Sequence, residues 1–162
     1  MTVPSASPLF LREPEIRRGI ELLYFGYLNF TETADATLER QGLGRAHHRA
    51  LYFIAQRPEI PVGDLLKLLR ITKQSLGRVL GDLNDRGHLQ TLPGLRDRRQ
   101  RLLKLTDSGA ALEAELFEAL RTKMTDAYSE AGQGSVTGFW RVLESLIPAD
   151  QRSRLPNLGN VG

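Results

Sequence analysis

The sequence contains no cysteine. Disulfide frameworks, thiolate nucleophiles, cysteine-ligated zinc and thiol redox sensors are therefore excluded. Long apolar runs are also missing, since the longest uninterrupted one, at residues 22–28, is far shorter than the ~18 residues that cross a bilayer. The first residues have neither the basic start nor the long apolar run of a signal peptide. We therefore expect a cytoplasmic protein with no membrane partner.

Signatures of enzymes and metal sites are equally scarce. His47 and His48 are adjacent in a predicted helix and point about 100° apart, so they cannot readily hold one metal together. His88 stands alone, and no nucleophile-elbow pattern or convincing pair of catalytic carboxylates occurs. We expect structural roles for the three histidines, and neither enzymatic activity, metal nor cofactor.

The basic residues are unevenly distributed. The 162 residues, 41% hydrophobic and 25% charged, support an ordinary packed core and carry a net charge of +3. Residues 60–106 hold ten basic and four acidic side chains, a net +6, so the remainder is −3. A basic centre on acidic arms is typical of a polyanion-binding protein. The alternative is a solvated basic face without a partner.

Hydrophobic periodicity divides the chain into helices and two strand-like runs. The expected helices cover residues 15–41, 45–57, 62–69, 73–87, 107–131 and 135–147. The strand-like runs are residues 89–92 and 101–106, joined by a basic loop that contains Pro93 and Gly94. Thr106 is a plausible cap for the long helix that follows. We expect an irregular arm at residues 1–14 and a polar tail at 149–162.

A helix-turn-helix followed directly by a hairpin is a winged helix. The predicted fold class is therefore mainly α with a small β-hairpin wing, flanked by long terminal helices. We expect an amino-terminal arm and dimerisation helix at residues 1–44, a winged lobe at 45–106, carboxy-terminal dimerisation helices at 107–148 and a tail at 149–162.

The predicted helix at residues 73–87, which is the second helix of the helix-turn-helix, has two different faces. Leu76, Val79, Leu80 and Leu83 form an apolar face that would pack into the lobe. The opposite face is polar and includes two glycines, Gly77 and Gly81, each of which costs ~1 kcal/mol in a helix interior relative to alanine. A flat polar face suits the DNA major groove, although the glycines alone could instead permit close helix packing. The predicted contacts here are Thr72, Lys73, Gln74, Ser75 and Arg78.

The loop between the strand-like runs concentrates positive charge. Arg96, Arg98, Arg99 and Arg101 are crowded around a single acid, Asp97. Arginine on a protruding ribbon suits the minor groove, where the negative potential attracts it. We predict that Asp97 holds a neighbouring arginine in a fixed pose, and that Arg101 and Lys104 contact the DNA backbone.

Residues 43–112 resemble the MarR family of bacterial winged-helix transcription regulators. The resemblance lies in ITKQSLGRVLGDLNDRGHL and in the wing sequence DRRQR, followed by Leu103-x-Leu105-Thr106-x-x-Gly109. ITKQSL and DRRQR are most similar to the PetP-like branch. The family implies a homodimer on a pseudo-palindromic operator of double-stranded DNA, and a response to a small ligand or to oxidation. Without cysteine, the thiol version of that response is excluded. A winged-helix adaptor that binds only proteins is the competing hypothesis.

Two further sets of side chains are predicted to form a dimer interface and an effector pocket. Apolar stripes at both ends exceed what a slim arm could bury on itself, which predicts an obligate dimer through Leu9, Phe10, Ile16, Ile20, Leu23, Phe139, Trp140, Leu143, Leu146 and Ile147. Effectors of the related regulators often occupy the region where the first helices meet the winged lobe. The candidate effector pocket consists of Tyr24, Tyr27, Phe30, His48, Tyr52 and Phe53, with an ordinary aromatic core as the alternative.

Overall fold

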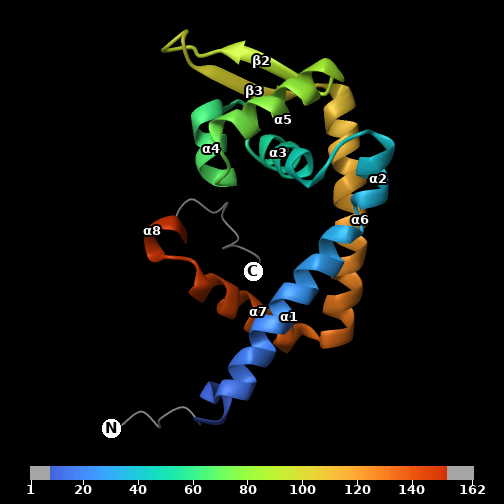
Figure 1. The fold of residues 1–162 in the computed structure, drawn as a ribbon, viewed down its shortest axis with the longest axis vertical. Helices are drawn as coiled ribbons and strands as arrows, with labels where there is room; N and C mark the ends of the chain where they lie inside the picture. The colour runs from blue at the N-terminus through green and yellow to red at the C-terminus, as the bar shows by residue number, and fades with distance from the viewer. Residues whose placement is uncertain (1–7, 153–162) are drawn as a thin grey trace. The chain divides into compact units, whose positions relative to one another are not determined.

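The computed structural model describes residues 8–152 (Figure 1). The elements are η1 (Pro8–Leu11), α1 (Glu13–Glu32), α2 (Asp35–Arg40), α3 (Arg45–Gln56), β1 (Ile60–Pro61), α4 (Val62–Leu69), α5 (Lys73–Asp85), β2 (Leu89–Pro93), β3 (Arg101–Leu105), α6 (Asp107–Ala131), α7 (Gln133–Leu146) and α8 (Ala149–Arg152). The chain divides into two compact units, and the division falls within α6, between Arg121 and Thr122. The predicted fold class, mainly helical with a winged helix-turn-helix, is confirmed. The expectations for residues 1–7 and 153–162 lie outside the described residues.

The winged lobe combines α3, α4 and α5 with a three-stranded antiparallel sheet of order β1-β3-β2. In the hairpin, Leu89 is opposite Leu105, Thr91 opposite Leu103, and Pro93 opposite Arg101. Figure 1 shows the hairpin lying along α5 and projecting past it. The short strand β1, which pairs Ile60 with Leu103, was not predicted, because two residues are too few to show a periodic pattern.

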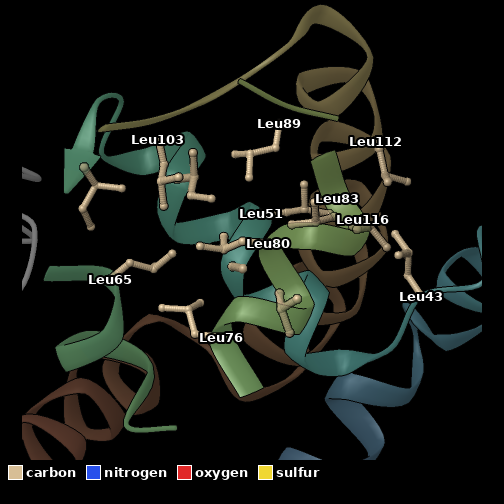
Figure 2. Close-up of a cluster of buried hydrophobic side chains, with 14 of the residues drawn as sticks. Leu43, Leu51, Leu65, Leu76, Leu80, Leu83, Leu89, Leu103, Leu112 and Leu116 are labelled. Carbon is tan, nitrogen blue, oxygen red and sulfur yellow. The ribbon is translucent and has the colours of Figure 1, made fainter. Parts of the chain in front are cut away.

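Leucines from α3, α4, α5, the hairpin and α6 form most of the core of the lobe (Figure 2). Leu51 of α3, Leu65 of α4, Leu83 of α5, Leu103 of β3 and Leu116 of α6 are all 1% exposed or less. Burying one such side chain stabilises the fold by about 1.5–3 kcal/mol. Four buried residues of α5 (Leu76, Val79, Leu80 and Leu83) confirm the predicted apolar face of this helix. That face fixes which side of α5 remains outside.

The single helix predicted for residues 15–41 is wrong. The structure has two helices, α1 and α2, with a break at Thr33 and Ala34. The Thr33 hydroxyl donates to the Phe30 carbonyl at 2.7 Å, which satisfies a carbonyl at the end of α1. Ala34 is fully buried and Leu38 is 2% exposed. The break therefore lets this segment pack against the core, and tertiary packing overrides the continuous helical pattern. Upstream, η1 and the start of α1 also replace part of the expected irregular arm.

The junction between the wing and α6 is tightly bonded. The Thr106 hydroxyl accepts a hydrogen bond from the Gly109 N–H at 3.1 Å, which confirms Thr106 as the cap. The same hydroxyl donates to the Gly87 carbonyl at 2.6 Å, and the Thr106 N–H donates to the His88 carbonyl at 3.1 Å. These bonds join the end of β3, the start of α6 and the segment before β2. Within residues 8–152, no helix is long and apolar enough to cross a membrane.

Candidate nucleic-acid interface

The start of α5 is fixed by the turn that precedes it. Arg70, with φ at 52°, adopts the left-handed conformation and ends α4. Thr72 then caps α5, because its hydroxyl oxygen accepts a hydrogen bond from the Ser75 N–H at 3.1 Å and donates to the Ser75 hydroxyl at 2.8 Å. Lys73 and Gln74, the first two helical residues, are exposed. The first turn therefore presents a cation and an amide next to free backbone N–H groups, an arrangement suited to phosphate.

The outer face of α5 is flat and polar, as predicted. Arg78 is exposed on it beside Gly77 and Gly81. A Cβ atom built on either glycine would meet nothing within 4 Å. Close packing against another part of the described chain therefore does not account for these glycines.

Two contacts that the sequence did not predict hold α5 in place. The Asp82 carboxylate lies 2.8 Å from His47 Nε2, while the other ring nitrogen of His47 accepts a hydrogen bond from the Gly44 N–H at 3.0 Å. At the end of α5, the Arg86 guanidinium donates to the carbonyls of Gln41 and Gly42, both at 3.1 Å. These partners are more than 30 positions away in sequence, so no local pattern indicates them.

Each of the three histidines is either hydrogen-bonded to another residue of the protein or partly buried. His47 bonds Asp82, and His88 Nδ1 lies 2.8 Å from the Ser108 hydroxyl. Burial lowers the pKa of His48, because a charged imidazole loses hydration there, and the nearby Arg49 acts in the same direction. In the described part of the chain, no group of three or more His, Asp or Glu side chains is placed to hold a metal ion.

The tip of the wing is a compact turn built around Asp97. Its backbone carbonyl accepts a hydrogen bond from the Gln100 N–H, and its carboxylate accepts one from the Arg99 N–H, both at 3.0 Å. Asp97 therefore contacts a neighbouring arginine, Arg99, through its backbone N–H and so shapes the main chain of the loop. The two-residue spacing is that of an Asx turn. Gly94 is required here, because a Cβ atom would lie 2.4 Å from the Asp97 carbonyl oxygen.

The arginines of the wing all face solvent. Arg96, Arg98, Arg99 and Arg101 are exposed. Among residues 8–152, no carboxylate forms an ion pair with any of them or with Arg78. Leu95, at the tip, is 97% exposed and was not among the predicted contacts, because only its position between Gly94 and Arg96 indicates it. The tip of the wing therefore carries exposed cationic side chains and one exposed apolar side chain.

Arg101 and Lys104 lie on different faces of β3. Arg101 is opposite Pro93, on the face that also carries the buried Leu103. Lys104 is opposite Gln90, on the other face, because side chains alternate along a strand. The two predicted backbone contacts thus point to opposite sides of the sheet.

The candidate effector residues include one pair of contacting rings, but the two tyrosines on α1 face solvent. Tyr24 and Tyr27 are exposed on α1, and Phe30 is half-buried. On α3, Tyr52 and Phe53 meet edge to face with ring centres 5.4 Å apart. Two cavities lie elsewhere: one of about 300 Å³ between α5 and the hairpin, and one of about 430 Å³ formed by α6 and α7 around Tyr128 and Trp140.

Comparisons with known proteins agree with this geometry. Residues 41–100 match the model of the MarR family. The chain is 47% identical over 145 residues to the HTH-type transcriptional regulator PetP of Rhodobacter capsulatus, covering 89% of this chain and 87% of PetP. A mutant MarR from E. coli, complexed with operator DNA, has a similar fold, with a TM-score of 0.65 and 23% identity over 83% of this chain and 96% of that one.

A second solved structure is NadR in complex with 4-hydroxyphenylacetate. It has a TM-score of 0.68 and 20% identity, covering 90% of this chain and 96% of that one. Both structural likenesses concern the fold. The high identity to PetP over nearly the whole length, together with the family match at the helix-turn-helix, establishes the relationship. The chain belongs to the MarR family of transcription regulators.

Proposed function

We propose that this regulator binds operator DNA as a homodimer, with α5 in the major groove and the wing in the adjacent minor groove. The observation that carries the proposal is the exposed set of cations on two neighbouring elements of one lobe, Arg78 on α5 and the wing arginines, none paired with a carboxylate within residues 8–152. Crowded like charges do not stabilise the folded protein, but they favour the binding of a polyanion such as DNA. A mutant MarR from E. coli that shares this fold was solved in complex with operator DNA, which supports DNA as the partner.

Each predicted residue has a role in this arrangement. Lys73, Gln74 and Arg78 read base edges or contact phosphates, since Gln can bond adenine and Arg can bond guanine in the major groove. Thr72 and Ser75 contribute through the capped helix start. The wing places Arg96, Arg98 and Arg99 at the minor groove on the turn shaped by Asp97. Arg101 and Lys104 remain proposed backbone contacts.

The surfaces of α1 and α7 support the dimer. Several large apolar side chains on α1 are about half exposed or more, including Ile16 at 47% and Ile20 at 62%. On α7, Trp140 is 44% and Leu146 is 64% exposed. Large apolar side chains exposed in such numbers are typical of protein interfaces. Sedimentation should give twice the mass of one chain, and Ile20→Asp should shift the protein towards monomer. A wild-type monomer at micromolar concentration would contradict the dimer.

The second part of the proposal is that the regulator responds to a small molecule. The support is the aromatic group Tyr24, Tyr27, Phe30, His48, Tyr52 and Phe53, together with the fold shared with NadR, which was solved with an aromatic acid bound. A thermal-shift screen of aromatic acids, repeated on Tyr52→Ala, tests this. Stabilisation that persists in the variant would place the ligand elsewhere.

Arg99→Ala is the direct test of DNA binding. We expect a strong loss of affinity in a gel-shift titration and an almost unchanged melting temperature, because Arg99 is exposed and supports no packing. DNA affinity of the wild type should fall steeply with salt, by about one power of salt concentration per neutralised phosphate. Unchanged affinity in Arg99→Ala, or no salt dependence in the wild type, would favour a protein-binding adaptor.

A further inference from the structure

A groove of about 300 Å³ separates α5 from the hairpin. Gly77, Gly81 and Asn84 line it on the helix side, and Thr91 and Arg101 line it on the strand side. Its floor is apolar and consists of Leu80, Leu89 and Leu103, three leucines of the core shown in Figure 2. The groove therefore has a hydrophobic base and polar walls.

The register of the hairpin explains why Thr91 and Arg101 reach this groove. Thr91 is opposite Leu103, and Arg101 is opposite Pro93, so both share the face of the buried Leu89 and Leu103. That face is turned towards α5. Thr91 and Arg101 lie farther out along the hairpin, where the core ends and solvent begins.

The polar groups of the groove are available to a ligand. Asn84, Thr91 and Arg101 are all exposed. Their side chains make no hydrogen bond or ion pair with other residues in the range 8–152. An amide, a hydroxyl and a guanidinium are all donors, and together they suit an anion whose oxygens accept hydrogen bonds.

The two glycines keep the helix side of the groove open. Neither would place a Cβ atom within 4 Å of another atom, so alanine would fit at both positions and would favour the helix by up to ~1 kcal/mol. The stability of the lobe therefore gives no reason for glycine. A surface that must approach close to another chain does give one.

The geometry of duplex DNA indicates which part of the DNA would approach this groove. A sugar–phosphate strand runs along every boundary between a major and a minor groove. If α5 enters the major groove and the wing enters the adjacent minor groove, that strand must pass between them. The groove lies at this position, with donors on both walls.

We propose that this groove seats the sugar–phosphate strand between the two DNA grooves, with Arg101, Thr91 and Asn84 bonding its phosphates and Gly77 and Gly81 admitting its sugars. The inference rests on the proposed DNA-binding function and extends it. Because phosphates carry no base identity, the groove contributes affinity and register but no sequence preference.

The test uses the full-length protein and a mixed-sequence duplex of about 30 base pairs. Binding is followed by fluorescence anisotropy over a series of salt concentrations, and each variant is also melted. Gly81→Leu should bind at least tenfold more weakly than wild type, with Gly81→Ala intermediate, although both should melt at or above the wild-type temperature. Stability and affinity thus change in opposite directions, which misfolding cannot produce.

Arg101→Gln tests the phosphate contact. The slope of log affinity against log salt should become shallower by about 0.9 per subunit, which corresponds to about eightfold weaker binding per contact at 0.1 M salt. Lys123→Gln removes the same charge from α6, outside the winged lobe, and should keep the wild-type slope. Thr91→Val should weaken binding severalfold without changing the slope, because it removes a neutral donor.

The outcomes separate the two proposals. If Arg99→Ala loses affinity while Gly81→Leu and Arg101→Gln bind as wild type, the groove proposal is wrong and the proposed function stands. If Arg101→Gln and Lys123→Gln weaken binding equally, the effect is general charge and the groove proposal is again wrong. If neither wild type nor any variant binds the duplex, the proposed function itself fails.

Discussion

Gly109→Ala should destabilise the protein, although alanine normally favours a helix. Gly109 lies in the first turn of α6 against the backbone of His88. A Cβ atom there would lie 2.0 Å from the His88 carbonyl oxygen and 2.9 Å from its carbonyl carbon. Real Cβ atoms essentially never come closer than 3.0 Å to another heavy atom. The obstacle is main chain, so no side-chain rotation relieves it.

The backbone of His88 cannot move freely either. Its carbonyl accepts the Thr106 N–H, and the Thr106 hydroxyl donates to the neighbouring Gly87 carbonyl at 2.6 Å. Relieving the clash breaks at least one of these bonds, at a cost of about 1 kcal/mol. Overpacking adds about 1–3 kcal/mol, and helix propensity returns at most ~1 kcal/mol. With the full return from helix propensity, we therefore expect a net loss of about 1–3 kcal/mol in the free energy of unfolding.

Thermal melting followed by circular dichroism measures this effect. For a chain of this size, each kcal/mol shifts the melting temperature by about 2–4 °C, so the midpoint should fall by about 2–12 °C. The matched control is Gly63→Ala on the exposed start of α4, where a Cβ atom meets nothing within 4 Å. It should melt at or slightly above the wild-type temperature. A Gly109→Ala protein as stable as this control would refute the proposed packing.

Two further predictions concern base reading and pH. Arg78→Ala should relax base preference at a cost of ~1–3 kcal/mol if it bonds a guanine, as measured by affinity across operator variants selected from random DNA; unaltered discrimination would refute that role. Burial lowers the pKa of His48 below the 6.5 of an unburied imidazole, so the unfolded chain binds the extra proton first. This contribution to stability is present above pH 6.5 and is lost as the pH falls towards the folded-state pKa. Melting at pH 7.5 and 5.5 should show a smaller drop for His48→Gln than for wild type, and equal drops would contradict this.

Local patterns predicted the parts of the fold that depend on local causes. The apolar spacing of α5, the cap at Thr106 and the turn of the wing, which begins with Gly94, are each encoded within a few residues. The same holds for the exposed arginines, since a crowded cluster of like charges cannot be buried. The helix α5 and the wing were therefore identified from sequence, although their contacts with DNA remain predictions.

Contacts between distant segments could not be predicted in this way. The break before α2 exists because Ala34 and Leu38 pack into the core, and nothing in the local pattern marks it. The short strand β1 is defined only by its partner, β3. Asp97 has neighbouring arginines on both sides, and the sequence does not indicate which group of which arginine it contacts; in the structure that group is the Arg99 backbone N–H. The groove between α5 and the hairpin depends on both their register and their packing.

The one-sided packing of α5 has a practical consequence for engineering. Its four core residues, its Thr72 cap and its Asp82 and Arg86 anchors are distinct from the exposed Lys73, Gln74 and Arg78. A combinatorial library at those three exposed positions would leave the scaffold intact. If the proposed base contacts are right, selection from such a library would direct the regulator to new target sites without redesigning its interior.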